Sequence, residues 1–452
     1  MKIALLHYRV GENDGVSLEM RKWRSVLEKM GHEVTYIAGS LGKEEGYEVP
    51  SITYDNPRNK IILNNAFEKL EEFNPGSLIE EIKAYSNEIK RSLKPIIKRE
   101  EIDCIVGSNI WSLGCNLSLP LALKEFDGRN PLLIGHHHDF HWERVFYSKP
   151  TSNYVRNLLE DNFPPADLDG HVVINTIARE ELATKKGVDS AVIPNVFDFN
   201  DAKWKKDSFN HDLKKKLDIE KGDLVFLQAT RIVERKAIEL ILHVLKVFTE
   251  EFFPFLVGSK NPSGETIDRR SKVHLVLPGF AEKDSSEYQQ KLEALTKIMP
   301  FTTHFVKDLC LQERTFAEKE KKYSLWDFYT IADFTTYPSI LEGWGNQFLE
   351  SVFAKKPIIV FEYPVLRKDI LPKGFNVISL GDSFTVNDFL RIYQVEHEKV
   401  RKAAKKCMDL IKEPGLYKNM VEKNFEIGKK NYSYENLQEM LEKLFSSISW
   451  SE

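Results

Sequence analysis

The sequence predicts an α/β protein with parallel sheets, divided into at least two domains. Short apolar runs such as 3–7, 131–135 and 224–229 alternate with charged segments of helical period, as in βαβ units. These runs are continuous rather than alternating, which is typical of strands buried on both faces. At 452 residues the chain also exceeds the usual size of one hydrophobic core, so two or three domains are expected.

Composition and charge narrow the class of protein. The chain is 42% hydrophobic and 29% charged, as in a soluble globular protein, and its net charge of −4 provides no field that attracts nucleic acid. The four cysteines are widely spaced and form no C-x-x-C pair, which predicts reduced thiols in a cytoplasmic protein. The N-terminal residues do not have the pattern of a signal peptide. No apolar run reaches the roughly 20 residues that a membrane-spanning helix needs.

The N-terminal half begins with a βαβ unit. A strand is expected at 3–7, a helix at 18–30 and a strand at 33–37, with a glycine-containing loop at 11–17. This loop lacks G-x-G-x-x-G, so by itself it is a weak sign of nucleotide binding. Residues 61–100 follow as a long charged segment of helical period. The remaining strands of this half are expected at 102–106, 131–135 and 171–174.

Four of the twelve histidines fall within six residues, directly after the strand expected at 131–135. In an extended chain His136 and His138 face one side and His137 the other. His136, His138 and Asp139 have metal-binding side chains, but no second ligand cluster completes such a site. The alternative is a polar loop with one histidine capping the sheet edge. The position is informative, because open parallel sheets bind ligands at the carboxyl ends of their strands.

The C-terminal half starts after a polar stretch at 199–221, where a hinge is expected. Arg231 and Lys236 follow the strand at 224–229, and an amphipathic helix is expected at 238–248. A guanidinium fork and an ammonium group together complement the about two negative charges of a diphosphate. The alternative is a pair of solvated cations. Further elements are expected as strands at 274–278, 301–306 and 376–380, mainly helix over 281–325, charged helix from 385 and a final helix at 436–445.

The segment 337–350 is the most informative stretch of the chain. A strand at 334–337 is followed by a loop with two glycines, a helix from Asn346 and another strand at 358–361. Free N–H groups and the positive end of a helix dipole suit an anionic ligand. Glu342 and Glu350 would be separated by about 12 Å along a helix, which suits two contacts on one extended ligand. Taken alone, the pair also fits two solvated glutamates on an amphipathic helix.

This stretch resembles the retaining glycosyltransferases of family 4. Glu342 and Glu350 match their E-x7-E signature, and Pro338-Ser339 followed by Glu342-Gly343-x-Gly345 matches its family 4 form. Arg231 and Lys236 match the two cations of the family's Gly-Arg-x4-Lys-Gly motif, although Thr230 and Ala237 replace its glycines. Gly15 and Val16 match part of the family's first loop, where Asp14 replaces a glycine. Pro194-Asn195 is similar to the end of the family's first domain.

The resemblance implies a GT-B fold, with two Rossmann-like, doubly wound domains facing across a cleft. Residues 1–200 would form the acceptor-binding domain and residues 201–430 the sugar-nucleotide-binding domain. The helix within 431–452 would pack back on the first domain.

The resemblance also implies roles for site residues. Arg231 and Lys236 would stabilise the leaving diphosphate, Glu350 would hold the ribose, and Glu342 would hold the donor sugar. A histidine would position the sugar or the acceptor, with His137 favoured by a His-x-Asp pattern and His138 second. The catalytic set is thus His137, His138, Arg231, Lys236 and Glu342; the donor-binding set is Gly15, Val16, Arg231, Lys236, Gly279, Gly343, Trp344, Gly345 and Glu350.

The implied reaction is the transfer of a hexose from a nucleoside-diphosphate sugar, of the UDP-glucose or GDP-mannose type, to a hydroxyl with retained configuration. The expected partners are that donor and a small polar acceptor, without nucleic acid or membrane. No metal or other cofactor is expected, since Arg231 and Lys236 do what a magnesium ion would. The alternatives are a sugar-nucleotide epimerase on the same fold, a phosphorylase, for which no pyridoxal lysine can be assigned, and an inactive binding or assembly subunit. Such a subunit would be expected to lose Arg231, Lys236 or Glu350.

Overall fold

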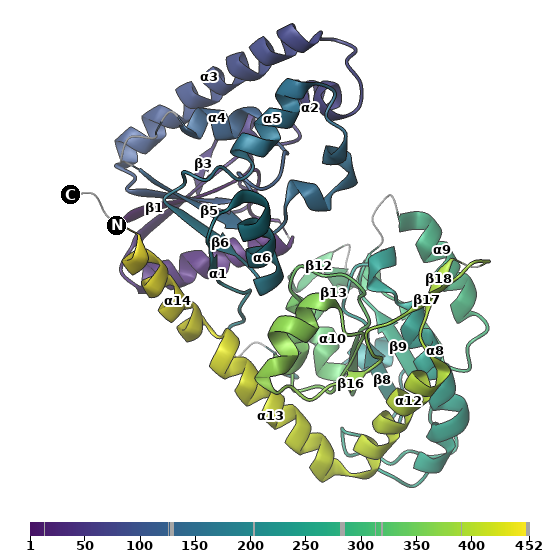
Figure 1. Ribbon diagram of the computed structural model, residues 1–452. Helices are drawn as coiled ribbons and strands as arrows, with labels where there is room; N and C mark the ends of the chain where they lie inside the picture. Colours follow the sequence, from purple (N-terminus) through teal and green to yellow (C-terminus); the bar gives the residue numbers. More distant parts are fainter. Residues whose placement is uncertain are drawn as a thin grey trace. The chain divides into compact units, whose positions relative to one another are not determined.

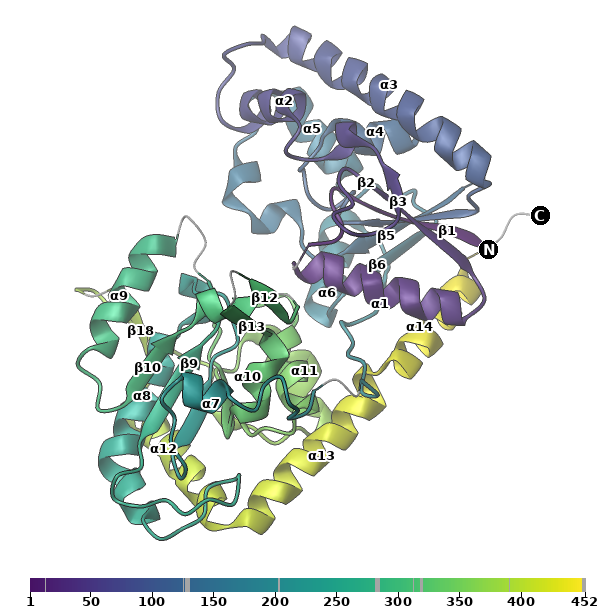
Figure 2. The same cartoon turned by 180° about the vertical axis from the view of Figure 1, so that it is seen from behind.

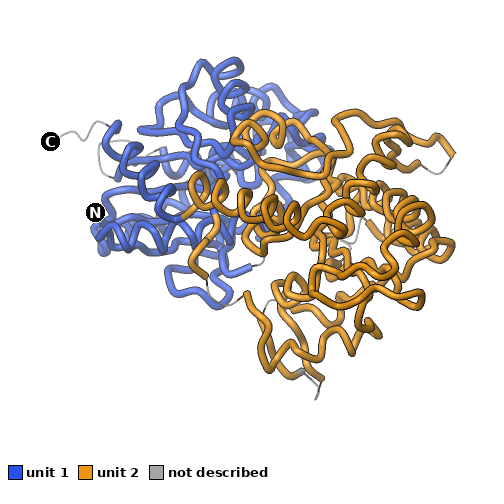
Figure 3. Tube along the Cα trace, turned by 90° about the horizontal axis from the view of Figure 1, so that it is seen from below, with its two compact units in different colours: residues 1–196, 434–452 blue, residues 197–433 orange. Residues whose placement is uncertain are grey.

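The chain folds into two compact units, unit 1 with residues 1–196 and 434–452 and unit 2 with residues 197–433 (Figure 3). The computed structural model describes residues 1–12, 14–124, 126, 131–201, 204–280, 285–311, 313–317, 320–389 and 391–448. Each unit is an open parallel sheet with helices on both faces (Figures 1 and 2), which confirms the predicted doubly wound α/β class. Within the described ranges, no helix is long and apolar enough to cross a membrane.

Unit 1 contains a seven-stranded parallel sheet in the order β3-β2-β1-β4-β5-β6-β7. From β1 the chain builds strands towards one edge and then, from β4, towards the other. The neighbours β1 and β4 therefore form the switch point, beside whose carboxyl ends ligands bind in such sheets. The strands are β1 (Lys2–His7), β2 (Glu33–Ala38), β3 (Gly46–Glu48), β4 (Cys104–Ser108), β5 (Leu132–His137), β6 (Gly170–Val173) and β7 (Ala191–Val192).

Two apolar clusters hold helices on the two faces of this sheet (Figure 2). One face carries α2 (Pro57–Phe67), α3 (Pro75–Glu100), α4 (Ser118–Lys124) and α5 (Asn153–Asn162), and the other carries α1 (Gly15–Lys29) and α14 (Tyr434–Ser447). A further helix, α6 (Thr176–Lys186), packs Leu182 against Val173.

The helical pattern predicted for 61–100 is interrupted. The Asn65 side chain accepts hydrogen bonds from the amides of Glu71, Glu72 and Phe73 at 2.9–3.3 Å, which fixes a turn between α2 and α3. Asn74 then caps α3 in a capping box.

Unit 2 contains a six-stranded parallel sheet in the order β10-β9-β8-β14-β15-β16. The switch point here lies between β8 and β14, which are direct neighbours. The loops after these two strands therefore leave the same edge of the sheet side by side. The strands are β8 (Leu224–Leu227), β9 (Val273–Leu277), β10 (Thr302–Phe305), β14 (Phe334–Tyr337), β15 (Ile358–Val360) and β16 (Ile378–Ser379).

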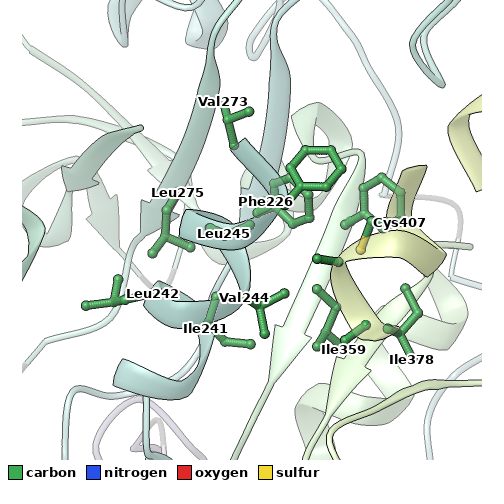
Figure 4. Packing of buried hydrophobic residues seen from close by; sticks show 14 of the residues in the cluster. Phe226, Ile241, Leu242, Val244, Leu245, Val273, Leu275, Ile359, Ile378 and Cys407 are labelled. Carbon is green, nitrogen blue, oxygen red and sulfur yellow. The ribbon is translucent and has the colours of Figure 1, made fainter. Parts of the chain in front are cut away.

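The largest core of unit 2 lies under α8 (Glu239–Val247), which packs Ile241 and Leu245 against Phe226 and Leu275 of the sheet (Figure 4). The helix expected at 238–248 is confirmed as α8, and most of its side chains are buried, with Lys246 exposed. Cys407 of α12 (His397–Lys412) belongs to the same core. The other helices of unit 2 are α7 (Leu213–Lys216), α9 (Ser286–Thr296), α10 (Leu325–Ile331), α11 (Asn346–Phe353) and α13 (Pro414–Tyr432).

Two predictions of helix in unit 2 are wrong in part. Three short strands form a small sheet in the order β11-β13-β12: β11 (Cys310–Leu311), β12 (Thr315–Ala317) and β13 (Glu320–Ser324). From residue 385 the chain forms a hairpin, β17 (Thr385–Asn387) and β18 (Ile392–Gln394), before α12 begins. Both stretches contain β-branched and aromatic residues, such as Thr315-Phe316 and Thr385-Val386, whose preference for strands outweighs the charged periodicity. Residues 281–284, 312 and 318–319 of the first prediction lie outside the described residues.

Candidate functional site

The loops after β8 and β14 meet at the switch point of unit 2. The amide of Ile340 donates a hydrogen bond to the carbonyl of Arg235 at 3.0 Å, which ties the second loop to the first. The cations predicted at Arg231 and Lys236 therefore lie beside the predicted loop of Glu342. The adjacency of β8 and β14 produces this meeting, although 106 residues separate Lys236 from Glu342.

Glu342 is held by two cations. Its carboxylate forms an ion pair with the ammonium of Lys236, and the two side chains are only 10% and 5% exposed. Arg235 Nη1 lies 2.7 Å from Glu342 Oε2 and also donates to the carbonyl of Leu341 at 3.1 Å. The ammonium of Lys236 lies 5.2 Å from the ring centroid of Tyr337. Sequence reasoning missed Arg235, although its place beside Lys236 in the turn after β8 was a usable signal.

The charges at this edge of unit 2 depend on one another. Burial raises the pKa of the Glu342 carboxyl, but Lys236 and Arg235 outweigh burial and hold that pKa below its usual value. Burial lowers the pKa of Lys236, Arg235 and Arg231 lower it further, and Glu342 opposes them. Two cations thus contact one ionised carboxylate, and Arg231 adds a third positive charge that acts on Lys236. This positive excess suits a ligand that carries phosphate groups.

Glycine is required at the start of α11 for a steric reason. Gly345 has φ +150°, and a Cβ there would lie 2.4 Å from the hydroxyl oxygen of Tyr363. That hydroxyl donates a hydrogen bond to the carbonyl of Trp344 at 2.6 Å, so Tyr363 fixes the loop where the helix begins. Gly343 is exposed on this loop. The side chain of Trp344, predicted to bind the donor, is buried and packs edge-on against Tyr432.

Glu350 lies in the second turn of α11 and is half-buried. The hydroxyl of Tyr329, in α10, donates a hydrogen bond to Glu350 Oε2 at 2.7 Å. Burial raises the pKa of Tyr329, and the Glu350 carboxylate raises it further, so this tyrosine remains a donor. The two glutamates of the motif therefore have different surroundings, with cations around Glu342 and a tyrosine donor at Glu350.

Gly279 brings a third loop to the same edge. It follows β9, the neighbour of β8, and a Cβ at this position would lie 1.8 Å from the carbonyl oxygen of Thr230. The amide of Ile232 donates to the carbonyl of Phe280 at 2.9 Å. The predicted donor-site glycine thus lets the loop after β9 approach the Thr230-Arg231 backbone closely.

In unit 1, the predicted loop at Gly15 and Val16 is closed by Asp14. One oxygen of the Asp14 carboxylate accepts the amides of Val16 at 3.0 Å and Ser17 at 3.1 Å. Its other oxygen accepts the Ser17 hydroxyl at 2.8 Å and lies 3.6 Å from Arg9 Nε. Two N–H groups of this predicted donor loop therefore already bind a carboxylate, because Asp14 stands where the family has glycine.

The histidine run continues β5, so its side chains alternate as predicted. The ring centroids of His136 and His138 lie 4.1 Å apart. His137 points the other way, and its Nε2 atom lies 3.1 Å from Nδ1 of His171. His137, the preferred histidine, is fully buried and contacts Phe140, while His138 is half-buried.

His7 and Asn109, at the ends of β1 and β4, were missed by sequence reasoning. The Asn109 side chain accepts the amides of His138 and Asp139 at 2.7 and 3.2 Å. His7 Nδ1 lies 2.7 Å from the carbonyl oxygen of Ser108. Burial lowers the pKa of His138 to about 3 and that of His7 to about 4, so both imidazoles are neutral at physiological pH. Their places directly after the two strands of the switch point were the available signal.

A metal site at the histidine run was considered from the sequence. Among the residues that the structure describes, no group of three or more His, Cys, Asp or Glu side chains is arranged to hold a metal ion.

Comparisons with known proteins agree with this architecture. Residues 209–426 match the family described as Glycosyl transferases group 1. The chain is 43% identical to a mannosylglucosylglycerate synthase of Petrotoga mobilis, over 92% of this chain and 95% of that protein. It is 40% identical to a mannosylglucosylglycerate synthase of Thermotoga maritima, over 98% of this chain and 99% of that protein.

Solved structures show a similar fold at low sequence identity. Sucrose-phosphate synthase from Thermosynechococcus elongatus matches with a TM-score of 0.62 at 12% identity, over 99% of this chain and 98% of that chain. The Anabaena protein HepE in complex with UDP matches with a TM-score of 0.58 at 13% identity, over 99% of this chain and 100% of that chain. These likenesses support the GT-B fold.

Proposed function

Because this chain belongs to the group 1 glycosyltransferases, we propose that it transfers a mannosyl group from a nucleoside-diphosphate mannose to an acceptor built of glucose and glycerate. The sugar and the acceptor come from the names of the two relatives, which match this chain over almost their whole length. The observation that carries sugar-nucleotide chemistry is the cluster of Arg235, Lys236 and Glu342 at the switch point of unit 2.

The residues of unit 2 have distinct tasks in this proposal. Arg231, Arg235 and Lys236 stabilise the negative charge that develops on the diphosphate as it leaves. Glu342 fixes the two cations that it contacts and accepts hydrogen bonds from the donor sugar. Glu350, held by Tyr329, binds the ribose hydroxyls.

The proposed reaction retains the anomeric configuration. The bond between sugar C1 and the phosphate oxygen breaks, the acceptor oxygen bonds to C1 on the same face, and the hydroxyl proton passes to the leaving diphosphate. No metal takes part, because the cations of unit 2 neutralise the diphosphate. In unit 1, the side chains after β1, β4 and β5 serve the acceptor, with neutral His7 and His138 as hydrogen-bonding groups.

The test is a direct assay of transfer. The full chain is incubated with GDP-mannose, UDP-glucose or ADP-glucose, and with glucosylglycerate, glycerate or no acceptor, each with and without EDTA. Mass spectrometry and proton NMR identify the product and its anomeric configuration. We expect mannose transfer from one nucleotide to glucosylglycerate, unaffected by EDTA and at least about 100-fold slower in Lys236→Ala.

Three outcomes would contradict parts of this proposal. Interconversion of the sugar nucleotide without an acceptor would identify an epimerase. Nucleotide binding without turnover would favour a binding or assembly subunit. Loss of transfer with EDTA would show that a metal takes part.

A further inference from the structure

Unit 2 has a basic pocket at the amino ends of β14 and β15, away from the loops that follow β8 and β14. Its volume is about 190 Å³, and Lys205, Lys206 and Lys356 line it together with the rings of Trp204 and Tyr329. Lys356 lies just before β15, and α10, which holds Tyr329, leads into β14. The glycosyltransferase motifs do not include any of these five residues.

Positively charged lysines outnumber the acidic side chains around this pocket. Asp333 is buried, its carboxylate accepts the amide of Val225 at 2.9 Å, and Lys206, Lys214 and Lys356 all act on it electrostatically. Across the described parts of the chain, no carboxylate lies within ion-pair distance of the ammonium groups of the three lining lysines. One carboxylate is thus opposed by several cations, an arrangement that binding of an anion would stabilise.

The charge state of Lys356 reflects this excess. Its pKa is lowered to about 8, mainly by burial; Asp333 opposes this shift, whereas Lys206 and Lys214 add to it. An anion in the pocket would reverse part of this shift, because an opposite charge favours the protonated ammonium group.

We propose that this pocket binds a small phosphate monoester. Lysine ammonium groups bind phosphate as point charges, and the Trp204 ring offers an apolar surface to a short carbon skeleton. The volume of about 190 Å³ is below the about 300–1,000 Å³ of pockets for larger ligands, so a sugar nucleotide does not fit. The site is therefore distinct in both place and ligand from the proposed donor site.

The pocket is joined to the donor-site helix by direct contacts. Tyr329 lines the pocket with its ring, while its hydroxyl donates to Glu350 of α11 at 2.7 Å. The ring centroid of Trp204 lies 5.0 Å from that of Tyr329 and 5.3 Å from that of Phe353, the last residue of α11. An occupant that orders these rings would favour the arrangement in which Tyr329 holds Glu350, and would thereby tighten nucleotide binding. This coupling rests on the proposed role of Glu350, whereas anion binding does not.

The first experiment measures binding directly. The full chain is titrated calorimetrically with glycerol 2-phosphate and with inorganic phosphate at constant ionic strength and pH 7. We expect saturable binding of glycerol 2-phosphate, weakened at least about tenfold in Lys206→Gln and in Lys356→Gln, since each removes a charge-assisted hydrogen bond. Lys297→Gln, which removes one exposed charge after α9, should bind as wild type does.

Equal binding in wild type and both pocket variants, or no saturable binding, would overturn the site. Binding of inorganic phosphate without binding of glycerol 2-phosphate would overturn the assignment of a monoester. Because Lys206 is exposed, Lys206→Gln should fold normally and keeps the test valid if Lys356→Gln does not fold.

The second experiment tests the coupling. The dissociation constants of GDP and UDP are measured with and without saturating glycerol 2-phosphate, in wild type and in Tyr329→Phe. We expect the anion to tighten nucleotide binding about fivefold or more in wild type and to have no such effect in Tyr329→Phe, which keeps the ring but lacks the hydroxyl. Anion binding without any change in nucleotide affinity would remove the coupling and leave the anion site intact.

Discussion

At the scale of single residues, Lys236 and Glu342 depend on each other. The sequence predicted them as separate contacts, a cation for the diphosphate and a carboxylate for the donor sugar. The structure pairs them and adds Arg235. Motif spacing predicted both residue types, but their contact follows from the adjacency of β8 and β14, which spacing alone does not contain.

This pairing makes Glu342 a positioning residue for Lys236. Glu342→Gln should lower kcat/KM for transfer by about 100-fold, because the cations that face the diphosphate lose their fixed partner. Since Glu342 raises the pKa of Lys236, its removal should also move the alkaline limb of the pH–rate profile to lower pH. Both are read from steady-state kinetics across pH. Glu101→Gln breaks the exposed ion pair with Lys2 and is the matched control. An unchanged alkaline limb would contradict the role of Glu342.

Gly279 gives a second prediction at this scale. Gly279→Ala should lower the free energy of unfolding by about 2 kcal/mol or more, because its Cβ would overlap the carbonyl of Thr230. Gly415→Ala is the control, since nothing lies within 4 Å of its added methyl group, and in α13 alanine should stabilise by about 0.5–1 kcal/mol. Chemical denaturation measures both. A neutral effect of Gly279→Ala would mean that the loop after β9 moves away freely.

At the scale of elements, β5 shows what a strand pattern predicts and what it leaves open. The alternation of His136, His137 and His138 followed from the period of a strand and is confirmed. The preference for His137 over His138 came from a resemblance in sequence. Burial of His137 against Phe140 and His171 depends on how β6 and the following loop pack, which alternation along one strand does not specify.

Buried and half-buried histidines of unit 1 predict an acid-sensitive fold. Burial lowers the pKa of each from 6.5, to about 4 for His7, His141 and His171 and to about 3 for His138. Above pH 6.5 these imidazoles are neutral in both the folded and the unfolded chain, so they do not reduce the free energy of unfolding there. Below pH 6.5 the unfolded chain binds protons first, so the native state loses up to about 1.4 kcal/mol per pH unit for each imidazole, until pH falls to about 4.

Urea unfolding at pH 7, 6 and 5, followed by circular dichroism, measures this slope. His138→Asn should make the slope shallower, whereas His397→Asn, which replaces an exposed histidine of α12, should leave it unchanged. Equal stability at pH 7 and pH 5 would contradict the prediction.

At the scale of the whole molecule, the two parallel sheets follow from the alternation of apolar runs with helical segments, and the exceptions have local causes. Apolar runs such as 3–7 and 224–229 predicted parallel sheets, because strands covered on both faces contain few polar residues. The three-stranded sheet at 310–324 and the hairpin from 385 were read as helix, since their charged residues mask short strands. Neither of these carries a predicted site residue, so the errors did not reach the site.

The last helix links the two ends of unit 1 and gives a prediction for the whole chain. Leu437, Leu441 and Phe445 of α14 are buried in one cluster with Met20 and Trp23 of α1, although more than 400 residues separate these helices. Leu441→Ala should therefore lower the free energy of unfolding of unit 1 by about 2–5 kcal/mol, the usual cost of such a cavity in a core.

The same substitution should leave nucleotide binding unchanged, because the cations and glutamates of the candidate donor site all belong to unit 2. Denaturation monitored in the presence and absence of the preferred nucleotide, with calorimetric titration of the folded variant, separates these effects. Lys443→Ala is the control, since this exposed position of α14 also becomes alanine. If Leu441→Ala weakened nucleotide binding at temperatures where unit 1 remains folded, nucleotide affinity would depend on the packing of α14 in unit 1, and the cations and glutamates of unit 2 would not account for it alone.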